Sequence, residues 1–336
     1  MKLKSKLFAA AIAATMLGGA AVQSQAQEMK FFRIGTGSAG GTYFPIGGLI
    51  ANAISNPPGA RPCDKGGSCG VPGLVAIAVS SNASVANVNS IQAGQLEAGL
   101  AGAQTVVEAF NGRGKFEGNA KDKLRVIANL YPEDMHLTLP KGASLASIGD
   151  LKGKRVGIAQ AGSGTQVTVE QILKSYDIGR DDYEAAELNN NQSAQRLADG
   201  QLDAYFYAMG TPSSALVQLG STKGFELYKF TEAEQTAINK MIPYYVPSLI
   251  PAGTYEAVDY DVPTVAVNGL LVTSADQPDD FIYEVTKALW NDNSRKLLDN
   301  GHAKGKVIRL ETALKGVLTP LHPGAERFYK EQGMIK

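Results

Sequence analysis

The feature that most limits how this chain can fold is a glycine-rich turn between a short apolar strand and an apolar helix. The strand pattern covers residues 31–34, the turn reads GTGSAGGT from Gly35 to Thr42, and a helical pattern begins at Tyr43. Small residues leave the backbone N–H groups of such a turn accessible, and the dipole of the following helix favours negative charge there. The turn is therefore predicted to hold an anion.

An export signal precedes this turn. Lys2, Lys4 and Lys6 are followed by an apolar run over residues 7–20 and by small residues up to Ala26. This order is typical of a secretory signal peptide, and the run is shorter than a membrane-spanning helix needs. We expect residues 1–26 to be removed after Ala26. Since no later apolar run is long enough to cross a bilayer, a periplasmic protein that does not itself span the membrane is predicted.

Charge and length narrow the function classes further. Removal of the three signal lysines leaves 29 Lys and Arg against 32 Asp and Glu. This mildly acidic balance argues against a nucleic-acid partner, which favours a basic surface. About 310 mature residues exceed what one compact core usually holds, so two lobes with a small-molecule cleft between them are expected.

The two cysteines, Cys63 and Cys69, enclose a short segment that contains two glycines. In an oxidising compartment such a pair predicts a disulfide that closes a small loop. A metal site is not expected, because His136, His302 and His322 lie far from the cysteines in the sequence.

Short β-branched runs alternate with helical patterns along the chain. The predicted strands are 71–79, 96–101, 124–128, 155–159 and 204–207. The predicted helices are 83–93, 165–176 and 193–197. This alternation predicts an α/β protein with a mostly parallel sheet.

Two internal similarities indicate that the lobes resemble each other. The segment GQLEA at residues 94–98 matches GQLDA at residues 200–204, and each glycine suits the position just after a helix end. A second small-residue turn, AGSGT at residues 161–165, also lies between a predicted strand and a predicted helix. Two helix N-termini facing one cleft would hold a carboxylate without a buried cation.

Enzyme motifs are present only in part. GTGSAG at residues 35–40 fits the dinucleotide pattern, but no acid follows at the required distance to bind a ribose. GGSCG at residues 66–70 fits a hydrolase elbow around Ser68, but it lacks a preceding strand and a following helix. We therefore predict no catalytic residues, no metal and no cofactor. An exported hydrolase-type enzyme in the same cleft, using Ser68 or a carboxylate, remains the alternative.

Several segments resemble one family of proteins. They are RIGTGSAGGTYFPIGGLIANAIS, SSNASVANV, AGSGT, ADGQLDAYFYAMGTP, IPAGTY and LHPGAERFYKEQG. Together they resemble TAXI-family solute-binding proteins of TRAP transporters, and especially the bacterial immunogenic cell-surface antigens of that family. The similarity is collinear over essentially the whole mature chain.

The resemblance implies a type II periplasmic-binding-protein fold, in which two α/β lobes are joined by crossing strands around a central cleft. We expect a first lobe over 27–132 and 268–336 and a second lobe over 133–267, with crossings near 130–139 and 262–273. The implied protein is a monomer that closes over a small solute. It then delivers the solute to the permease subunits of a TRAP transporter, which an ion gradient drives without ATP.

The family's ligand positions map onto three segments and three further residues. The first turn supplies Gly40, Gly41, Thr42 and Tyr43, the polar stretch supplies Ser80, Asn82 and Ser84, and the second turn supplies Gly162, Ser163, Gly164 and Thr165. Tyr207 and Gly210 are expected at the second-lobe wall. Gln104 is expected in place of a Gln-Ser-Asp run that many relatives have near the cleft. The loss of that acid should change the charge and hydrogen bonding of the pocket.

Paired helix N-termini favour a small carboxylate, such as an amino acid, a 2-oxo acid or a dicarboxylate. The lack of an assigned arginine leaves neutral polar solutes open.

Overall fold

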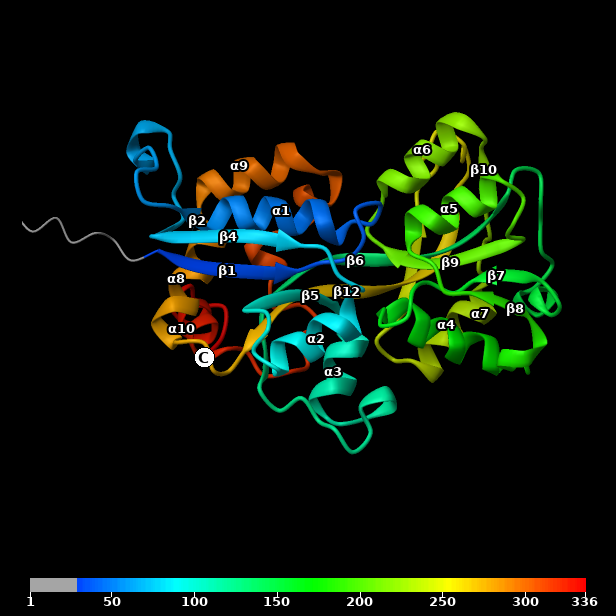
Figure 1. Cartoon of the computed structure of the whole chain (residues 1–336), viewed down its shortest axis with the longest axis horizontal. Helices are drawn as coiled ribbons and strands as arrows, with labels where there is room; N and C mark the ends of the chain where they lie inside the picture. The colour runs from blue at the N-terminus through cyan, green and yellow to red at the C-terminus, as the bar shows by residue number, and fades with distance from the viewer. Residues whose placement is uncertain (1–28) are drawn as a thin grey trace, which may run out of the picture.

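One sheet runs through the whole molecule, and helices cover both of its faces (Figure 1). The computed structural model describes residues 29–336, so the predicted signal peptide and its cleavage after Ala26 lie outside the described residues. Eight strands lie side by side in the order β4-β1-β5-β12-β6-β9-β7-β8, while β10 pairs with β6 and β11 with β12. A separate two-stranded sheet joins β2 and β3.

The strands and helices have the following bounds. The strands are β1 Lys30–Gly35, β2 Ser55–Asn56, β3 Val71–Pro72, β4 Leu74–Val79, β5 Ala98–Gly102, β6 Leu124–Pro140, β7 Arg155–Gly157, β8 Glu184–Ala186, β9 Ala204–Met209, β10 Phe225–Leu227, β11 Val246–Ile250 and β12 Val262–Ser274. The α-helices are α1 Tyr43–Ile54, α2 Ser84–Gln92, α3 Ala103–Phe110, α4 Gly164–Ser175, α5 Asn190–Ala198, α6 Ser214–Thr222, α7 Glu232–Met241, α8 Asp279–Leu289, α9 Asp292–Gly301 and α10 Pro323–Glu331. Short 3₁₀ helices are η1 Cys63–Lys65, η2 Gly114–Phe116, η3 Ile148–Leu151, η4 Arg180–Asp182, η5 Ala303–Val307 and η6 Leu310–Thr312.

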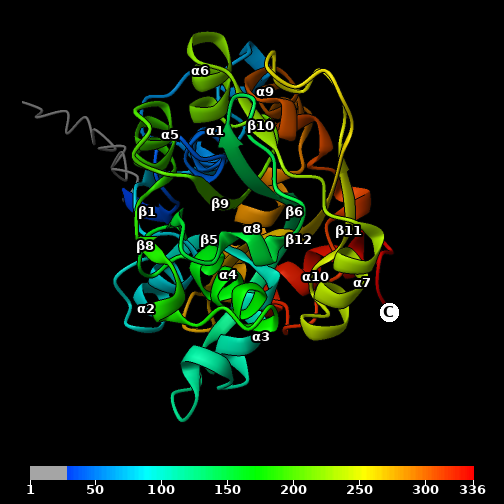
Figure 2. The same cartoon turned by 90° about the vertical axis from the view of Figure 1, so that its right-hand side faces the viewer.

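The elements gather into two lobes that the two longest strands connect. The first lobe contains β1, β4 and β5 with α1–α3 and α8–α10, and the second contains β7–β9 with α4–α7 (Figure 1). β6 has 17 residues and β12 has 13, and each runs from one lobe into the other. Both coincide with the predicted crossings. Viewed from the side of the second lobe, α5 and α6 lie on one side of β9 and α4 on the other (Figure 2). The precise lobe boundaries at residues 132 and 267 stay a prediction.

The prediction of a mostly parallel sheet is wrong. The pairs β1–β4, β1–β5, β7–β8 and β7–β9 are parallel. The long strands instead pair antiparallel with their neighbours, as in β12–β5, β12–β6 and β6–β9. Because these two strands carry the chain between the lobes in opposite directions, the sheet is mixed.

Local differences from the expected elements have local causes. The predicted strand 71–79 is interrupted at Gly73, whose φ of +82° leaves the extended region. The predicted helix 193–197 begins earlier, at Asn190, because the Asn189 side chain accepts a hydrogen bond from the Gln192 N–H and forms a capping box.

Glycine ends α2 and α5 in the same way. Gly94 and Gly200 both have φ of +69°, a conformation that favours glycine. After each of them the next N–H bonds back to the helix, Gln95 to the Ser90 carbonyl and Gln201 to the Arg196 carbonyl, both at 2.8 Å. These bonds form a Schellman motif at both sites, so the predicted C′ positions are confirmed.

Three apolar clusters stabilise the sheet. One lies in the first lobe between β1, β4, β5 and α1, α8–α10. Another lies in the second lobe around β9, α5 and α6. The third contains side chains from α2, α3, α4 and α7 and from both long strands, so it continues from one lobe into the other.

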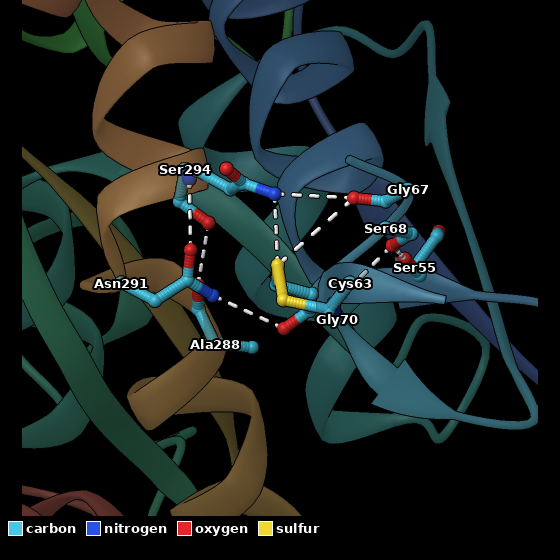
Figure 3. Close-up of a disulfide and its surroundings, with 10 residues drawn as sticks. Ser55, Cys63, Gly67, Ser68, Gly70, Ala288, Asn291 and Ser294 are labelled. Carbon is cyan, nitrogen blue, oxygen red and sulfur yellow. Dashed lines mark hydrogen bonds between the residues drawn. A yellow bond between two sulfur atoms is a disulfide. The ribbon is translucent and has the colours of Figure 1, made fainter. Parts of the chain in front are cut away.

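The predicted disulfide between Cys63 and Cys69 is present and closes an exposed loop of the first lobe (Figure 3). Asn291, just before α9, donates from Nδ2 to the Cys69 carbonyl at 3.1 Å. Asn293 donates from Nδ2 to the Gly67 carbonyl at 3.1 Å and to Cys69 Sγ at 2.8 Å. The start of α9 therefore fastens this loop to the lobe.

Within residues 29–336, the structure contains no helix with the length and apolar character needed to span a bilayer.

Candidate functional site

A small cavity lies between the two lobes, where the strands of each lobe end. Its volume is about 40 Å³, room for roughly three water molecules. It is lined by Gly37, Ser38, Gly41, Thr42, Tyr43, Ala83, Ser84, Gly102, Gln104, Thr105, Glu133, Ser163, Gly164, Thr165, Thr168, Tyr207, Ala208, Met209, Tyr245 and Val267. Both lobes and both long strands therefore contribute to one cavity.

Four helices begin at this cavity, α1, α2 and α3 from the first lobe and α4 from the second. Their N-cap residues Thr42, Ala83, Gly102 and Ser163 all line it. The Ser163 side chain caps α4 by accepting from the Gln166 N–H at 3.1 Å, whereas α1, α2 and α3 have no side-chain cap. Uncapped helix N-termini leave N–H groups and a partial positive charge for a bound anion.

The backbone at Ala83 is held in an unfavourable conformation, with φ of +70° and ψ of −146°. An alanine in this region costs of order 1–3 kcal/mol and persists only where the surrounding structure enforces it. Here it turns the chain from the end of β4 into α2 directly at the cavity.

The first turn enters the site in part. Gly41, Thr42 and Tyr43 line the cavity, but Gly40 does not. The Gly40 carbonyl instead accepts from Asn190 Nδ2 at 3.0 Å, and a Cβ at this position would overlap the Asn191 side chain. The second lobe therefore packs directly on Gly40, and the ligand role of this residue stays a prediction.

Of the predicted ligand residues Ser80, Asn82 and Ser84, only Ser84 lines the cavity, and its Oγ accepts a hydrogen bond from the Gly102 N–H at 3.1 Å. Ser80 donates from Oγ to the Gly37 carbonyl at 3.0 Å and supports the first turn from behind. Asn82 lies against Gly162 of the second lobe. Neither Ser80 nor Asn82 lines the cavity, and their ligand roles stay predictions.

In the second turn, Ser163, Gly164 and Thr165 line the cavity. Thr165 Oγ1 accepts from the Ala208 N–H at 3.2 Å and so joins the turn to β9. Gly162 is not part of the lining; its carbonyl accepts from the Ala86 N–H of α2 at 3.1 Å, across the lobes. Gly162 therefore makes a contact between the lobes, and its ligand role stays a prediction.

Of the three remaining predictions, Gln104 and Tyr207 line the cavity and Gly210 does not. Gln104 Oε1 accepts from Thr168 Oγ1 at 2.8 Å, and Tyr207 Oη donates to Gln160 Oε1 at 2.8 Å. Burial raises the pKa of Tyr207, which keeps the phenol neutral. The Gly210 carbonyl accepts from Thr42 Oγ1 at 2.5 Å, so Gly210 joins the lobes beside the cavity.

The ionisable residue of the site, Glu133 of β6, was not predicted from the sequence. This side chain is 5% exposed and lines the cavity, and Tyr43 Oη donates to its Oε2 at 3.0 Å. Desolvation raises the pKa of Glu133 to about 8, although the Tyr43 hydrogen bond and the charge of Lys304 act to lower it. The only signal in the sequence is an acidic pair, Glu133-Asp134, within a long strand that is otherwise largely buried.

The structure does not assemble the hydrolase that the sequence left open around Ser68. Ser68 lies beside the disulfide, where Oγ donates to the Ser55 carbonyl (Figure 3), and it is not among the cavity residues. His322 caps α10 by accepting from the Gly324 N–H at 3.1 Å. Ser68 and the cleft are therefore separate places in the fold.

The fold is periplasmic-binding-protein-like, with two lobes and a cavity between them. PhnD1 from Prochlorococcus marinus (MIT 9301), solved with methylphosphonate, is similar over 91% of this chain and 99% of its own, with 12% identity and a TM-score of 0.52. A ligand-binding component of an ABC-type import system from Staphylococcus aureus, solved with zinc bound, is similar over 91% and 93%, with 12% identity and a TM-score of 0.50.

The chain belongs to the NMT1-like family, whose model matches residues 34–333. This match overturns the assignment to the TAXI family of TRAP-transporter receptors. The prediction of a TRAP-type permease as the partner rested on that assignment and is no longer supported. The turns GTGSAGGT and AGSGT need small residues wherever helices of this fold begin at a cleft. Such motifs indicate the fold and do not identify the transporter.

Proposed function

We propose that this protein is an exported receptor that binds a small anionic solute between its lobes and presents it to a membrane permease. One observation carries the proposal: α1, α2, α3 and α4, from both lobes, begin at one cavity, and three of them lack a side-chain cap. A carboxylate, phosphonate or sulfonate group would satisfy those N–H groups. Among the described residues that line the cavity, none is Lys, Arg or His.

Capture follows from the contacts that both lobes share. An anion bonded to N–H groups of the first and second lobes at once binds the closed arrangement more tightly than the open one. A solute shifts that equilibrium only by this difference in affinity. The protein is proposed to bind and release its solute unchanged, as a receptor and not as an enzyme.

Thermal unfolding of the refolded mature protein tests the proposal. The panel contains amino acids, 2-oxo acids, dicarboxylates, phosphonates and sulfonates, with neutral sugars as the comparison. At about a thousand times its Kd, a ligand adds roughly 4 kcal/mol to the free energy of unfolding, which raises the midpoint by several degrees. Stabilisation by an anion that is recovered unchanged supports a receptor. Turnover of the anion would favour an enzyme in the same cleft, and stabilisation by sugars alone would contradict the anion site.

The second turn provides the matched variants. Ser163→Ala together with Thr165→Ala removes a helix cap and a bond to β9, and we expect at least tenfold weaker binding by calorimetry. Thr231→Ala removes a comparable cap from α7 of the same lobe, where Thr231 Oγ1 accepts from the Glu234 N–H. That control should lose stability and keep its affinity. Equal affinity in all three proteins would exclude the second turn from the site.

A further inference from the structure

Glu133 has the contacts of a group that receives part of the solute. Its side chain projects from β6 between the lobes, and Tyr43 Oη is bonded to Oε2 at 3.0 Å. Gly102 and Gly269 flank the carboxyl. A Cβ added at Gly102 would lie 3.6 Å from Oε2, and a Cβ added at Gly269 would lie 3.3 Å from Oε1. The two glycines therefore leave space around a buried acid at the wall of the cavity.

This acid has no cation of its own among residues 29–336. None of the ion pairs in that range includes Glu133. Lys304 of η5, whose charge acts on Glu133, pairs its Nζ with Asp134 Oδ2 at 3.3 Å. A buried carboxylate without a partner is costly, so it favours either a proton or a positively charged group of the ligand.

The cavity therefore has two electrostatically different ends. Helix N-termini carry partial positive charge and attract an anion, whereas Glu133 attracts a cationic hydrogen-bond donor. We propose that Glu133 is a specificity-determining residue that binds an ammonium group of the solute, so that the receptor selects small zwitterionic acids over the same acids without the amino group. This inference rests on the proposed function of the cavity.

The titratable and charged groups that face Glu133 come from each neighbouring element. They are Tyr43, the first residue of α1, Tyr131 and Asp134 of β6, Lys304 of η5, Tyr207 of β9, and Tyr245, which precedes β11. Desolvation raises the pKa of all four tyrosines, which keeps the phenols neutral near pH 7. Since the pKa of Glu133 is about 8, this acid is largely protonated at pH 6 and must lose its proton to receive an ammonium.

This proton gives the two classes of solute opposite pH dependences. An amino-bearing acid should bind more tightly as the pH rises from 6 to 8, by up to about tenfold per unit, and release one proton on binding. The same acid without the amino group should bind equally or less tightly over that range, because ionised Glu133 repels it.

The experiment is calorimetry of the full mature protein with matched probes at pH 6, 7 and 8. The pairs are glutamate with 2-oxoglutarate, alanine with pyruvate, and aminomethylphosphonate with methylphosphonate. For the pair that binds, we expect at least tenfold preference for the amino member. Glu133→Gln keeps the shape and an acceptor for Tyr43 Oη, and it should abolish both the preference and the pH dependence. Its thermal midpoint shows whether it is folded.

The wild-type comparison alone keeps the proposal falsifiable. Equal or tighter binding of the amino-free members overturns the role of Glu133 and leaves the anion receptor intact. A preference that persists in folded Glu133→Gln overturns it as well. If no member of any pair binds, the assignment of Glu133 is overturned, whereas the wider panel of anions decides the proposed function.

Discussion

Glu97 accepts a hydrogen bond from the backbone N–H of Arg33 and two more from its guanidinium, at 2.7–3.0 Å. Asp203 holds Arg155 in the same way, at 2.7–3.2 Å. Both acids follow Gly-Gln-Leu, and both arginines lie in the strand that leads to a glycine-containing turn. The strand registers agree too, because Ile34 pairs with Ala98 as Val156 pairs with Ala204. The two lobes therefore repeat one motif down to its ion pair.

This repeated pair predicts equal and additive effects on stability. Glu97→Gln and Asp203→Asn each remove a carboxylate charge near the surface, so each should lower the thermal midpoint by only about 1–2 °C. The sites lie in different lobes, so the double variant should show the sum. The pKa of both acids is lowered in the folded protein. For Asp203 the main cause is the hydrogen bond from Arg155. For Glu97 desolvation raises the pKa, but the hydrogen bonds and the charge of Arg33 together outweigh it. The stabilisation should therefore fade as acid protonates them. A double variant that unfolds far below the sum would contradict independent lobes.

The bond from Thr42 Oγ1 to the Gly210 carbonyl predicts an effect on closure. Thr42→Val keeps the shape of the side chain but removes a buried bond between the lobes, at a cost of about 1 kcal/mol. We expect a larger radius of gyration by X-ray scattering and solute binding weakened about fivefold. The control is Thr36→Val, which removes the bond from Thr36 Oγ1 to the Val79 carbonyl within one lobe. That variant should lose stability without opening, and equal scattering from both variants would argue against an inter-lobe role for Thr42.

His136 predicts acid sensitivity. Its Nδ1 bonds to the Asp134 carbonyl and its Nε2 to Tyr255 Oη, and desolvation lowers the pKa of the ring to about 4. The unfolded chain, with an ordinary histidine pKa near 6.5, binds more protons in this window. Stability should therefore be complete above pH 6.5 and fall as the pH drops from 6.5 toward 4. His136→Asn should show a shallower decline of the midpoint by differential scanning fluorimetry. Parallel curves for the two proteins would exclude His136 as the cause.

The disulfide predicts a loss of stability without a loss of binding. Replacing Cys63 and Cys69 by serine releases a small loop, which costs about 2 kcal/mol on chain-entropy grounds. None of the residues that hold this loop lines the cavity. The double variant should unfold a few degrees lower and bind the same solute with unchanged affinity. A weaker affinity would mean that the loop acts on the cleft.

The sequence predicted the features of the fold that depend only on residues adjacent in the chain. The turn at 35–42, the C′ glycines 94 and 200, and the second turn at 161–165 all follow from backbone freedom and helix ends, and the two turns supply seven of the twenty residues that line the cavity. What the sequence did not indicate depends on contacts between distant segments. The carbonyls of Gly40 and Gly162 each accept a hydrogen bond from the opposite lobe. Glu133 lines the cavity because β6 passes from one lobe to the other.

The place of β12 in the sheet has a consequence for how the protein is made. This strand lies between β5 and β6, yet it is synthesised long after both of them. Until residues 262–274 are available, the facing edges of β5 and β6 lack their partner, and unpaired edges invite association with other chains. A product truncated before β12 should therefore aggregate, and a single cut of the chain between β6 and β12 should give no soluble N-terminal fragment.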